Sequence, residues 1–359
     1  MASGPDEPLP LPHPSRPIVL IGAGGIVVDA HLPAYRLAGF SVIVVHDLDL
    51  GKAQAVAQRF GIPRVVATLE ETVRAAPPEA VFDVAVPASA LPVVLSALPD
   101  GAAVLIQKPF GENLGQARQL LALCRRKKLR ASVNFQLRYA PYIRAARAAV
   151  DRGEIGALHD IEVRVTVYTP WELWAFLEAS PRVEILYHSI HYVDLIRSFL
   201  GEPRGVHAKT VRHPRVPRLA STATNIALDY GDLLRANITT NHGHNFGPRH
   251  QESYVKWEGS RGAIKARLGL LLDYPKGSPD ALEICTLDAE GAPGAWREIP
   301  VQGSWYPHAF IGTMGELMRF ANGEIAAPAT RVEDAIRTMA VVEAAHESSA
   351  SGATPIPQP

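Results

Sequence analysis

The feature that most constrains this chain is an apolar segment, residues 18–21, that leads directly into the turn Gly22-Ala23-Gly24-Gly25. A segment long enough for a helix follows the turn, and a second apolar segment, residues 42–45, ends close to the acidic Asp47. A glycine turn alone is weak evidence, because any tight loop can use one. Strand, turn, helix, strand and terminal acid in this order together predict the first unit of a dinucleotide-binding sheet.

Each part of this unit has a physical role in holding a dinucleotide. Gly22 allows a sharp turn without the steric penalty of a Cβ. Gly24 lets the backbone approach a pyrophosphate, which lies on the N–H groups and the positive dipole end of the following helix. Asp47, at the tip of the second strand, is placed to accept hydrogen bonds from the ribose hydroxyls. We therefore expect the cofactor to contact Gly22, Gly24, Gly25, Ile26 and Asp47.

Strand-like and helix-like segments alternate through the first third of the chain. Further strands are expected at residues 65–66, 81–86, 103–106 and 130–135, and helices at residues 51–60, 69–76, 91–98 and 114–124. This alternation predicts an α/β fold with a doubly wound parallel sheet, a Rossmann domain. Such sheets bind ligands at the carboxyl ends of their strands, so Pro87, Lys108 and Asn134 are expected to join the cofactor site.

From about residue 139 the pattern changes. Residues 161–167 read Ile-Glu-Val-Arg-Val-Thr-Val, which is typical of a strand with one wet face. More strands follow at residues 206–211, 224–230, 233–240, 253–257, 263–268 and 282–287, with helices at residues 142–150, 184–200, 310–321 and 331–345. We predict an α+β domain with an open, largely antiparallel mixed sheet. The predicted organisation is a disordered tail over 1–15, a dinucleotide-binding domain over 16–138, a substrate-binding domain over 139–349 and a tail over 350–359.

The composition argues against several classes of partner. Lys+Arg and Asp+Glu both number 36 in the 359 residues, and a chain without net charge is not expected to bind nucleic acid or an anionic membrane. The two cysteines are too few for a disulfide framework. No apolar run approaches the roughly 20 residues that span a bilayer, and the Pro-rich N-terminus lacks the layout of a signal peptide. We therefore expect a cytoplasmic protein.

Lys108 is the first candidate for chemistry. It follows a buried-type strand and precedes Pro109, which fixes the local backbone and removes one donor. This places Lys108 at the carboxyl edge of the sheet, where the nicotinamide end of a dinucleotide is expected. It is either a lysine that polarises the reacting hydroxyl or carbonyl, or an ordinary surface lysine in a loop.

The segment 184–195 is the richest part of the second domain in candidates for chemistry. Tyr187, His188 and His191 are spaced to share one face of a helix, and Asp194 lies one turn further on. Histidine titrates near neutral pH, which suits proton transfer to or from an alcohol. The alternative is that His191 is a hydrogen-bonded core residue and His188 its solvated neighbour. Two histidines with a tyrosine on one face favour a functional site.

Nearby aromatic and histidine residues extend this candidate site. Trp171 and Trp174 could stack on sugar rings, although aromatics at this spacing are more often core. His242 and His244 alternate on one strand face, but no acidic or cysteine ligand clusters with them, so we expect no metal. The predicted substrate-binding residues are Lys108, Trp171, Trp174, Tyr187, His188, His191 and His244.

The order of these parts resembles the Gfo/Idh/MocA family of NAD(P)-dependent sugar and polyol oxidoreductases over about residues 16–349. The motifs that carry the resemblance are Gly22-Ala-Gly-Gly-Ile with Ala30-His-Leu-Pro, Asp47, Val84-Ala-Val-Pro87, Gln107-Lys108-Pro109, Arg138 with Pro141, and His191-Tyr-Val-Asp194. The resemblance implies that the substrate lies between the nicotinamide and the second domain. It also implies that Lys108 and His191 contact the reacting oxygen.

The chain departs from the family pattern at three positions. Gln107 replaces the usual glutamate before the lysine, and Val27 replaces the third small residue of the glycine turn. Tyr187 stands where the family commonly has an aspartate, four residues before the histidine, and Pro181-Arg-Val-Glu184 replaces a glycine-rich lead-in. Either Tyr187 or His188 could take over the contact of that aspartate.

These observations predict an enzyme that transfers hydride between a secondary alcohol or ketone of a sugar, cyclitol or related polyol and NAD. Lys108, His191 and Tyr187 are the expected catalytic residues. Asp47 favours NAD over NADP, because its carboxylate repels a 2′-phosphate and no basic residue follows it. Two alternatives stay open: a glycosidase that oxidises and re-reduces one sugar carbon with held NAD, and a non-catalytic nucleotide-sensing subunit. The resemblance further implies a homo-oligomer, a dimer or tetramer, that pairs through an apolar face of the second-domain sheet.

Overall fold

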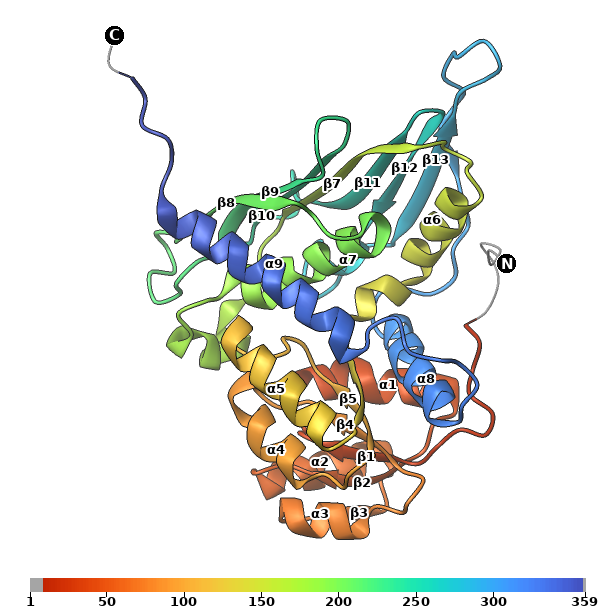
Figure 1. Ribbon diagram of the computed structural model, residues 1–359, viewed down its shortest axis with the longest axis vertical. Helices are drawn as coiled ribbons and strands as arrows, with labels where there is room; N and C mark the ends of the chain where they lie inside the picture. The colour runs from red at the N-terminus through yellow and green to blue at the C-terminus, as the bar shows by residue number, and fades with distance from the viewer. Residues whose placement is uncertain (1–8, 358–359) are drawn as a thin grey trace. The chain divides into compact units, whose positions relative to one another are not determined.

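The computed structural model describes residues 9–357, and the chain forms two compact units (Figure 1). The N-terminal unit contains residues 9–144 together with Gln302–Met339, and the second unit contains Ala145–Val301 together with residues 340–357. The sequence analysis places one boundary at residue 138 and assigns everything up to 349 to the second domain. The two units of the structure divide the chain differently from this prediction. Helix α8 (His308–Ala321) belongs to the N-terminal unit because it packs against the sheet and the first helix of that unit.

The N-terminal unit is built on a six-stranded sheet of order β3-β2-β1-β4-β5-β6, in which all neighbouring strands are parallel. The sheet confirms the predicted doubly wound arrangement. Every residue of β1, β4 and β5 is buried, as expected for strands with helices on both faces. The strands are β1 (Ile18–Ile21), β2 (Val42–His46), β3 (Arg64–Val66), β4 (Val81–Val84), β5 (Ala103–Ile106) and β6 (Arg130–Val133).

Helices connect these strands, and several begin at capping side chains that the sequence supplies. Asp49 accepts a hydrogen bond from the N–H of Lys52 at the start of α2, and Thr68 and Glu71 form a capping box at the start of α3. The helical segments of this unit are η1 (Val27–His31), α1 (Leu32–Ala38), α2 (Leu50–Phe60), α3 (Leu69–Ala75), η2 (Ala88–Ala90), α4 (Leu91–Ala97), α5 (Leu114–Arg126), η3 (Gln136–Tyr139) and α8.

The second unit contains an eight-stranded sheet of order β14-β13-β12-β11-β7-β10-β9-β8. Within the described strands of this sheet, β7–β10 is the one parallel pair, which confirms the predicted mixed and largely antiparallel sheet. The strands are β7 (Leu158–Thr166), β8 (Gly205–Val211), β9 (Ala223–Asp229), β10 (Arg235–Asn241), β11 (Glu252–Gly259), β12 (Gly262–Arg267), β13 (Ala281–Thr286) and β14 (Arg297–Glu298).

The helical segments beside this sheet include one kind of turn that the periodicity did not predict. Residues 184–200 form a π-helical turn, η5 (Ile185–Ser189), followed by α7 (Ile190–Leu200), which packs against β10. The other segments are η4 (Trp171–Ala179) and η6 (Gly269–Leu271), while α6 (Pro141–Asp151) and α9 (Val332–Ser351) carry the chain across the division between the units.

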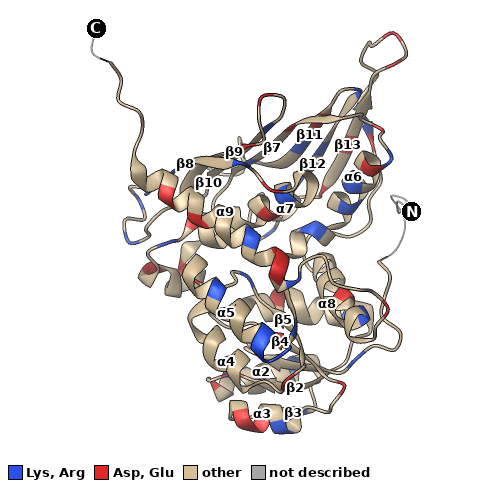
Figure 2. Ribbon diagram, in the orientation of Figure 1, with Lys and Arg blue, Asp and Glu red and all other residues tan. Residues whose placement is uncertain are grey.

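The two faces of the second sheet differ in polarity. Ile161, Val163 and Val165 on β7 are buried, whereas the alternating Glu162 and Arg164 are not. Charged residues occur along several strands of this sheet (Figure 2). Arg164 forms an ion pair with Glu252 on the neighbouring strand at 2.5 Å. One face of β7 is therefore buried within this chain, and the other carries charged residues, while pairing with a second copy stays a prediction.

Parts of the predicted tails are structured. Residues 1–8 and 358–359 lie outside the described residues. The N–H of His13 donates to Glu324, and Arg16 donates to the side chain of Asn322 and to the carbonyl of Ala321. At the other end α9 extends to Ser351. Across residues 9–357, none of the helices has the length and apolar character that crossing a membrane requires.

Candidate functional site

The glycine turn is shaped by two different requirements. Gly22 has φ +104°, and a Cβ there would overlap the carbonyl oxygen of Ala85 and lie 2.8 Å from its carbonyl carbon. Glycine is thus required at residue 22 by the close approach of β1 and β4 at their ends. At Gly24 the opposite holds, because nothing lies within 4 Å of the position that a Cβ would take. The exposed backbone of Gly24 and Gly25 therefore offers the open cradle that a pyrophosphate needs.

The helix after this turn begins with the π-helical segment η1. The carbonyl of Gly24 accepts hydrogen bonds from the N–H groups of Val27 and Val28, at 3.0 and 3.3 Å. The N–H groups of Gly25 and Ile26 precede these and lie at the open, positive end of the helix. The arrangement suits a negatively charged group.

Asp47 is held beside the turn by two backbone groups. Its Oδ2 accepts from the N–H of Ala23 at 2.7 Å, and its Oδ1 accepts from the N–H of Asp49 at 2.8 Å. Carboxylate oxygens have further lone pairs, so both remain able to accept from ribose hydroxyls. The side chain is fixed in place and half-buried at the carboxyl end of β2.

Lys108 and Pro87 follow β5 and β4 at the same edge of the sheet. The exposed Pro87 precedes η2, and the backbone N–H of Lys108 is 3.3 Å from Oε1 of Gln107. Lys108 is partly exposed, and the burial of its amine lowers its pKa from the ordinary value to about 8. A lysine with this pKa can exist in both protonation states near neutral pH, as proton transfer to or from an alcohol requires.

Asn134 faces a buried network. Its Oδ1 accepts from the hydroxyl of Thr313 at 2.8 Å, and its Nδ2 lies 3.3 Å from Nε2 of His31. Nδ1 of His31 and the hydroxyl of Tyr35 each lie 2.7 Å from Oδ2 of Asp83. Burial, with the charge of Asp83 added, raises the pKa of Tyr35 well above its ordinary value. All five side chains are buried, so the amide of Asn134 supports the sheet edge from within the protein.

The sequence analysis missed this network, although one signal for it was present. Asp83 is a charged residue inside the apolar strand β4, and its side chain has no exposure. A buried carboxylate requires hydrogen-bond donors, and His31 and Tyr35 on the first helix supply them. Which residues would supply them could not be read from sequence, because they lie about 50 positions away.

The π-helical turn η5 changes how the predicted histidine face is arranged. The N–H of Ile190 donates to the carbonyl of Ile185, a five-residue separation that adds one residue to the turn. Tyr187 consequently packs on the ring of Phe176, with centroids 5.8 Å apart, whereas His188 packs on Trp171 at 5.0 Å. Tyr187 and His188 thus make these ring contacts with different aromatic residues, and the face that they share with His191 stays a prediction.

The aromatic residues before this turn form a small hydrophobic cluster. Trp171, Leu177, Val183 and Leu219 are its buried members, and Trp174 and Tyr187 are among the side chains that pack against it. Burial of large aromatic surfaces stabilises this part of the second unit. The structure thus places Trp171 in this core and the half-buried Trp174 against it, and their contact with a sugar stays a prediction.

The histidines near the end of β10 lie in different surroundings. His242 is buried and its Nε2 lies 3.4 Å from Oε1 of Glu184, a fully buried residue that the sequence analysis did not select. His244 is half-buried, and its Nε2 lies 3.1 Å from the carbonyl of Arg249. Among the described residues, no group of three or more His, Cys, Asp or Glu side chains is arranged to hold a metal ion.

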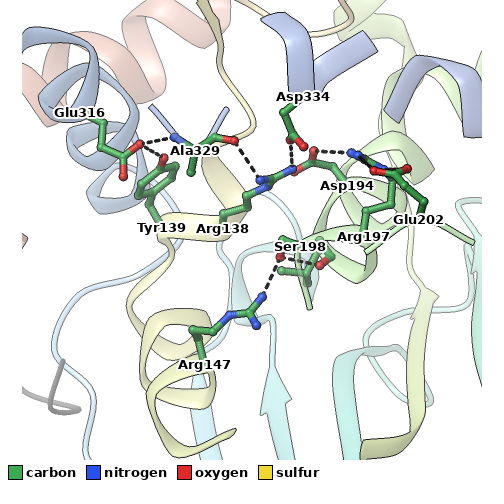
Figure 3. A network of polar contacts seen from close by, with 11 residues as sticks. Arg138, Tyr139, Arg147, Asp194, Arg197, Ser198, Glu202, Glu316, Ala329 and Asp334 are labelled. Carbon is green, nitrogen blue, oxygen red and sulfur yellow. Dashed lines mark hydrogen bonds and ion pairs between the residues drawn. The ribbon is translucent and has the colours of Figure 1, made fainter. Parts of the chain in front are cut away.

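His191 lies in α7 and is 7% exposed. Asp194, one turn further on, has its Oδ1 4.0 Å from Nη1 of Arg197, whose Nη2 is 2.5 Å from Glu202 (Figure 3). Asp194 thus has an ion-pair partner, Arg197, within the same helix.

The N-terminal unit contributes a second polar network around η3, also drawn in Figure 3. The hydroxyl of Tyr139 and the N–H of Ala329 both donate to Oε2 of Glu316, at 2.6 and 2.8 Å. Arg138 donates to Asp334 at 2.6 Å. Arg138 therefore ties the end of the sheet to the first turn of α9.

The fold and the glycine-turn site define an oxidoreductase with an NAD-binding Rossmann domain. Residues 16–135 match the model of the oxidoreductase family with an NAD-binding Rossmann fold, and residues 143–265 match the C-terminal domain model of the same family. The chain belongs to the Gfo/Idh/MocA family. Its cofactor is NAD, and the open cradle at Gly24 and the fixed Asp47 fit that cofactor.

Curated relatives and solved structures agree with this assignment. The D-apiose dehydrogenase of Paraburkholderia graminis is 26% identical over 349 residues, covering 93% of this chain and 88% of that protein. The inositol 2-dehydrogenase of Rubrobacter xylanophilus is 26% identical over 62% of this chain and 69% of its own length. A levoglucosan dehydrogenase in complex with NADH and levoglucosan shares the fold with a TM-score of 0.79 at 16% identity, covering 94% of this chain and 98% of that chain.

Proposed function

We propose that this protein oxidises a secondary alcohol of a sugar, cyclitol or related polyol, or reduces the corresponding ketone, with NAD as the redox partner. Relatives along most of the chain are dehydrogenases of D-apiose, and a further relative is an inositol dehydrogenase. The observation that carries the proposal is Lys108, an amine with a pKa of about 8 at the sheet edge that also holds the glycine turn.

Binding is assigned to the residues around the glycine turn. The N–H groups of Gly25 and Ile26 hold the pyrophosphate, while the carboxylate of Asp47 accepts from the adenosine ribose. The negative charge of Asp47 disfavours a 2′-phosphate, and the next residues, Leu48-Asp49, provide no base to offset it. These residues therefore favour NAD over NADP.

Proton handling is assigned to Lys108 and His191. When bound, NAD supplies the acceptor for the hydride that leaves the carbinol carbon. The hydroxyl proton passes to the neutral amine of Lys108, and in the reverse direction the ammonium returns it to the carbonyl oxygen. His191 donates to or accepts from the same oxygen, which keeps the substrate aligned during transfer. Tyr187 packs against the aromatic cluster, so we assign it a smaller part in the proton transfer than Lys108 and His191.

A screen of sugars, cyclitols and aminosugars with NAD tests the proposal, with the absorbance of reduced cofactor as the measurement. We expect at least one compound to give net reduction of NAD. Lys108→Ala should abolish that turnover and leave NAD affinity nearly unchanged. Full activity of Lys108→Ala would overturn the mechanism, and turnover without net NAD reduction would favour the glycosidase alternative.

A further inference from the structure

A cavity of about 370 Å³ lies at the amino ends of β4 and β5 in the N-terminal unit. The glycine turn, Asp47 and Lys108 follow the carboxyl ends of their strands, at the opposite edge of the same parallel sheet. The cavity is therefore separate from the cofactor site. Its volume is within the range of small-molecule sites in proteins, roughly 300–1,000 Å³.

The surface of this cavity is mostly apolar. Phe82 on β4 is 2% exposed and contributes its ring, and three prolines are among the other lining residues. An apolar surface of this kind suits the hydrocarbon part of a ligand. The apolar lining includes Ala76, Pro77, Pro78, Phe82, Pro99 and Ala103.

Two arginines that line the cavity converge on a single acceptor. Nη2 of Arg16 and Nη1 of Arg130 both donate to the carbonyl of Ala321, each at 2.9 Å. Ala321 is the last residue of α8, and a cation is favourable at a helix C-terminus. One arginine would satisfy this helix end. The second places a like charge beside the first, which is unfavourable unless an anion offsets it.

The other hydrogen bonds of these arginines go to neutral groups. Nε of Arg16 donates to Oδ1 of Asn322 at 2.7 Å, and its Nη1 donates to the backbone carbonyl of Glu79 at 2.9 Å. Arg130 makes its one hydrogen bond within residues 9–357 to the carbonyl at the end of α8. A guanidinium has five N–H donors, so Arg130 keeps most of its donors for a ligand.

The carboxylate that lines the cavity already has a partner. Oδ1 of Asp100 lies 2.7 Å from Nζ of Lys127, and the hydrogen bond and charge of Lys127 lower the pKa of Asp100. Across the described part of the chain, neither Arg16 nor Arg130 forms an ion pair with a carboxylate. The cavity thus carries a net positive charge.

We propose that this cavity binds a phosphate monoester with an apolar group, and that Arg16 and Arg130 hold its phosphate. Guanidinium groups bind phosphate oxygens through paired N–H donors. A phosphate monoester carries a charge of about −1.5 to −2 near neutral pH, which offsets two arginines, whereas a carboxylate offsets one. Phe82 and the prolines receive the apolar group. The site is distinct from the site of hydride transfer and does not depend on the proposed function.

Calorimetric titration of the NAD-saturated protein tests the site, because bound NAD already fills the pyrophosphate cradle. The probes are phenyl phosphate, inorganic phosphate, benzoate and phenol. We expect phenyl phosphate to bind saturably at one site, inorganic phosphate and benzoate to bind about tenfold more weakly, and phenol not to bind. Absence of saturable phenyl phosphate binding would overturn the proposal, and tighter binding of benzoate would overturn the choice of phosphate.

Variants of the arginines locate the bound probe. Arg130→Gln removes one charge at the cost of one hydrogen bond and should weaken phenyl phosphate binding about tenfold. The matched control is Arg126→Gln, at an exposed arginine that ends α5 and does not line the cavity. It should bind the probe like the wild type. NAD affinity should be the same in all three proteins. An unchanged affinity of Arg130→Gln for phenyl phosphate rules the site out.

A further variant keeps both arginines and their contacts with α8. Pro78 is exposed and lines the cavity, so Pro78→Glu adds a carboxylate beside the two charges. This variant should also weaken phenyl phosphate binding about tenfold, with thermal stability close to that of the wild type. If the arginines only cap α8, Arg130→Gln lowers the melting temperature while Pro78→Glu binds phenyl phosphate as the wild type does. That result would refute the proposal.

Discussion

Gly22 and Ala85 approach so closely that a Cβ on Gly22 would lie 2.8 Å from the carbonyl carbon of Ala85 and overlap its oxygen. The N–H of Ala85 also donates to the carbonyl of Ile21 at 2.8 Å, so the ends of β1 and β4 are locked together. The close approach of the two strands thus requires a glycine at residue 22. Gly24 lies in the same turn but has nothing within 4 Å of its Cβ position, so the two glycines have different roles.

Gly22→Ala should destabilise the protein by about 2 kcal/mol or more, because the new methyl meets backbone atoms and φ is +104°. NAD affinity should fall with it. Urea unfolding and a NAD titration measure the two effects. Gly24→Ala is the matched control, since nothing lies within 4 Å of its Cβ position. It should lower NAD affinity with little loss of stability, and equal destabilisation by both variants would contradict this assignment.

The carboxylate of Asp47 should set the preference for NAD over NADP. Replacing it in Asp47→Ser removes the charge that repels a 2′-phosphate, so the ratio of NADP to NAD affinity should rise about tenfold or more. Parallel titrations with the two cofactors provide the measurement. Asp49→Asn keeps a side chain able to cap α2 and should leave the ratio unchanged. A wild-type protein that binds NADP more tightly than NAD would rule out this role of Asp47.

The lowered pKa of Lys108, about 8, should appear in the pH dependence of oxidation. The neutral amine accepts the hydroxyl proton, so kcat/KM should rise as pH increases through about 8 and then level off. Lys108→Met should remove this dependence together with the activity, whereas Lys52→Met, at an exposed lysine, should not. A profile that is flat between pH 7 and 9 would contradict the assignment.

The same shift has a consequence for stability, with a definite sign. The folded-state pKa of Lys108 is below that of the unfolded chain, so between about pH 8 and the ordinary value of 10.5 the unfolded state binds more protons. The contribution of Lys108 to the free energy of unfolding should therefore increase with pH across this window. Urea unfolding of wild type and Lys108→Met at pH 7.5 and 9.5 measures this contribution. The free energy of unfolding of the wild type, relative to that of Lys108→Met, should be greater at pH 9.5 than at pH 7.5.

Asn134 should matter for stability because its amide bridges Thr313 and His31. Asn134→Ala leaves buried polar groups without a partner and should cost about 1–3 kcal/mol. Denaturant unfolding measures the loss. If Asn134→Ala instead weakened NAD binding and kept full stability, the amide would have to contact the cofactor.

The sequence predicted the architecture because the relevant signals are local. Buried apolar runs, glycines at strand ends and capping residues each act over a few positions, and they placed all six strands of the N-terminal sheet and the mixed sheet of the second unit. The edge position of Lys108 follows from the same rule, since it comes directly after a parallel strand. The strand–turn–helix pattern at Gly22 likewise indicated the class of cofactor.

What only the tertiary structure decided depends on contacts between distant residues. The extra residue in the η5 turn, which directs His188 to His242 and Tyr187 to Phe176, cannot be read from a spacing of three or four. The burial of Glu184 beside His242 and the return of α8 to the first sheet join segments far apart in the chain. By itself the sequence determined the sheets, the glycine turn and the cofactor class, because local periodicity encodes them. Packing decided which polar side chains meet, because burial forces each of them to find a partner wherever the fold supplies one.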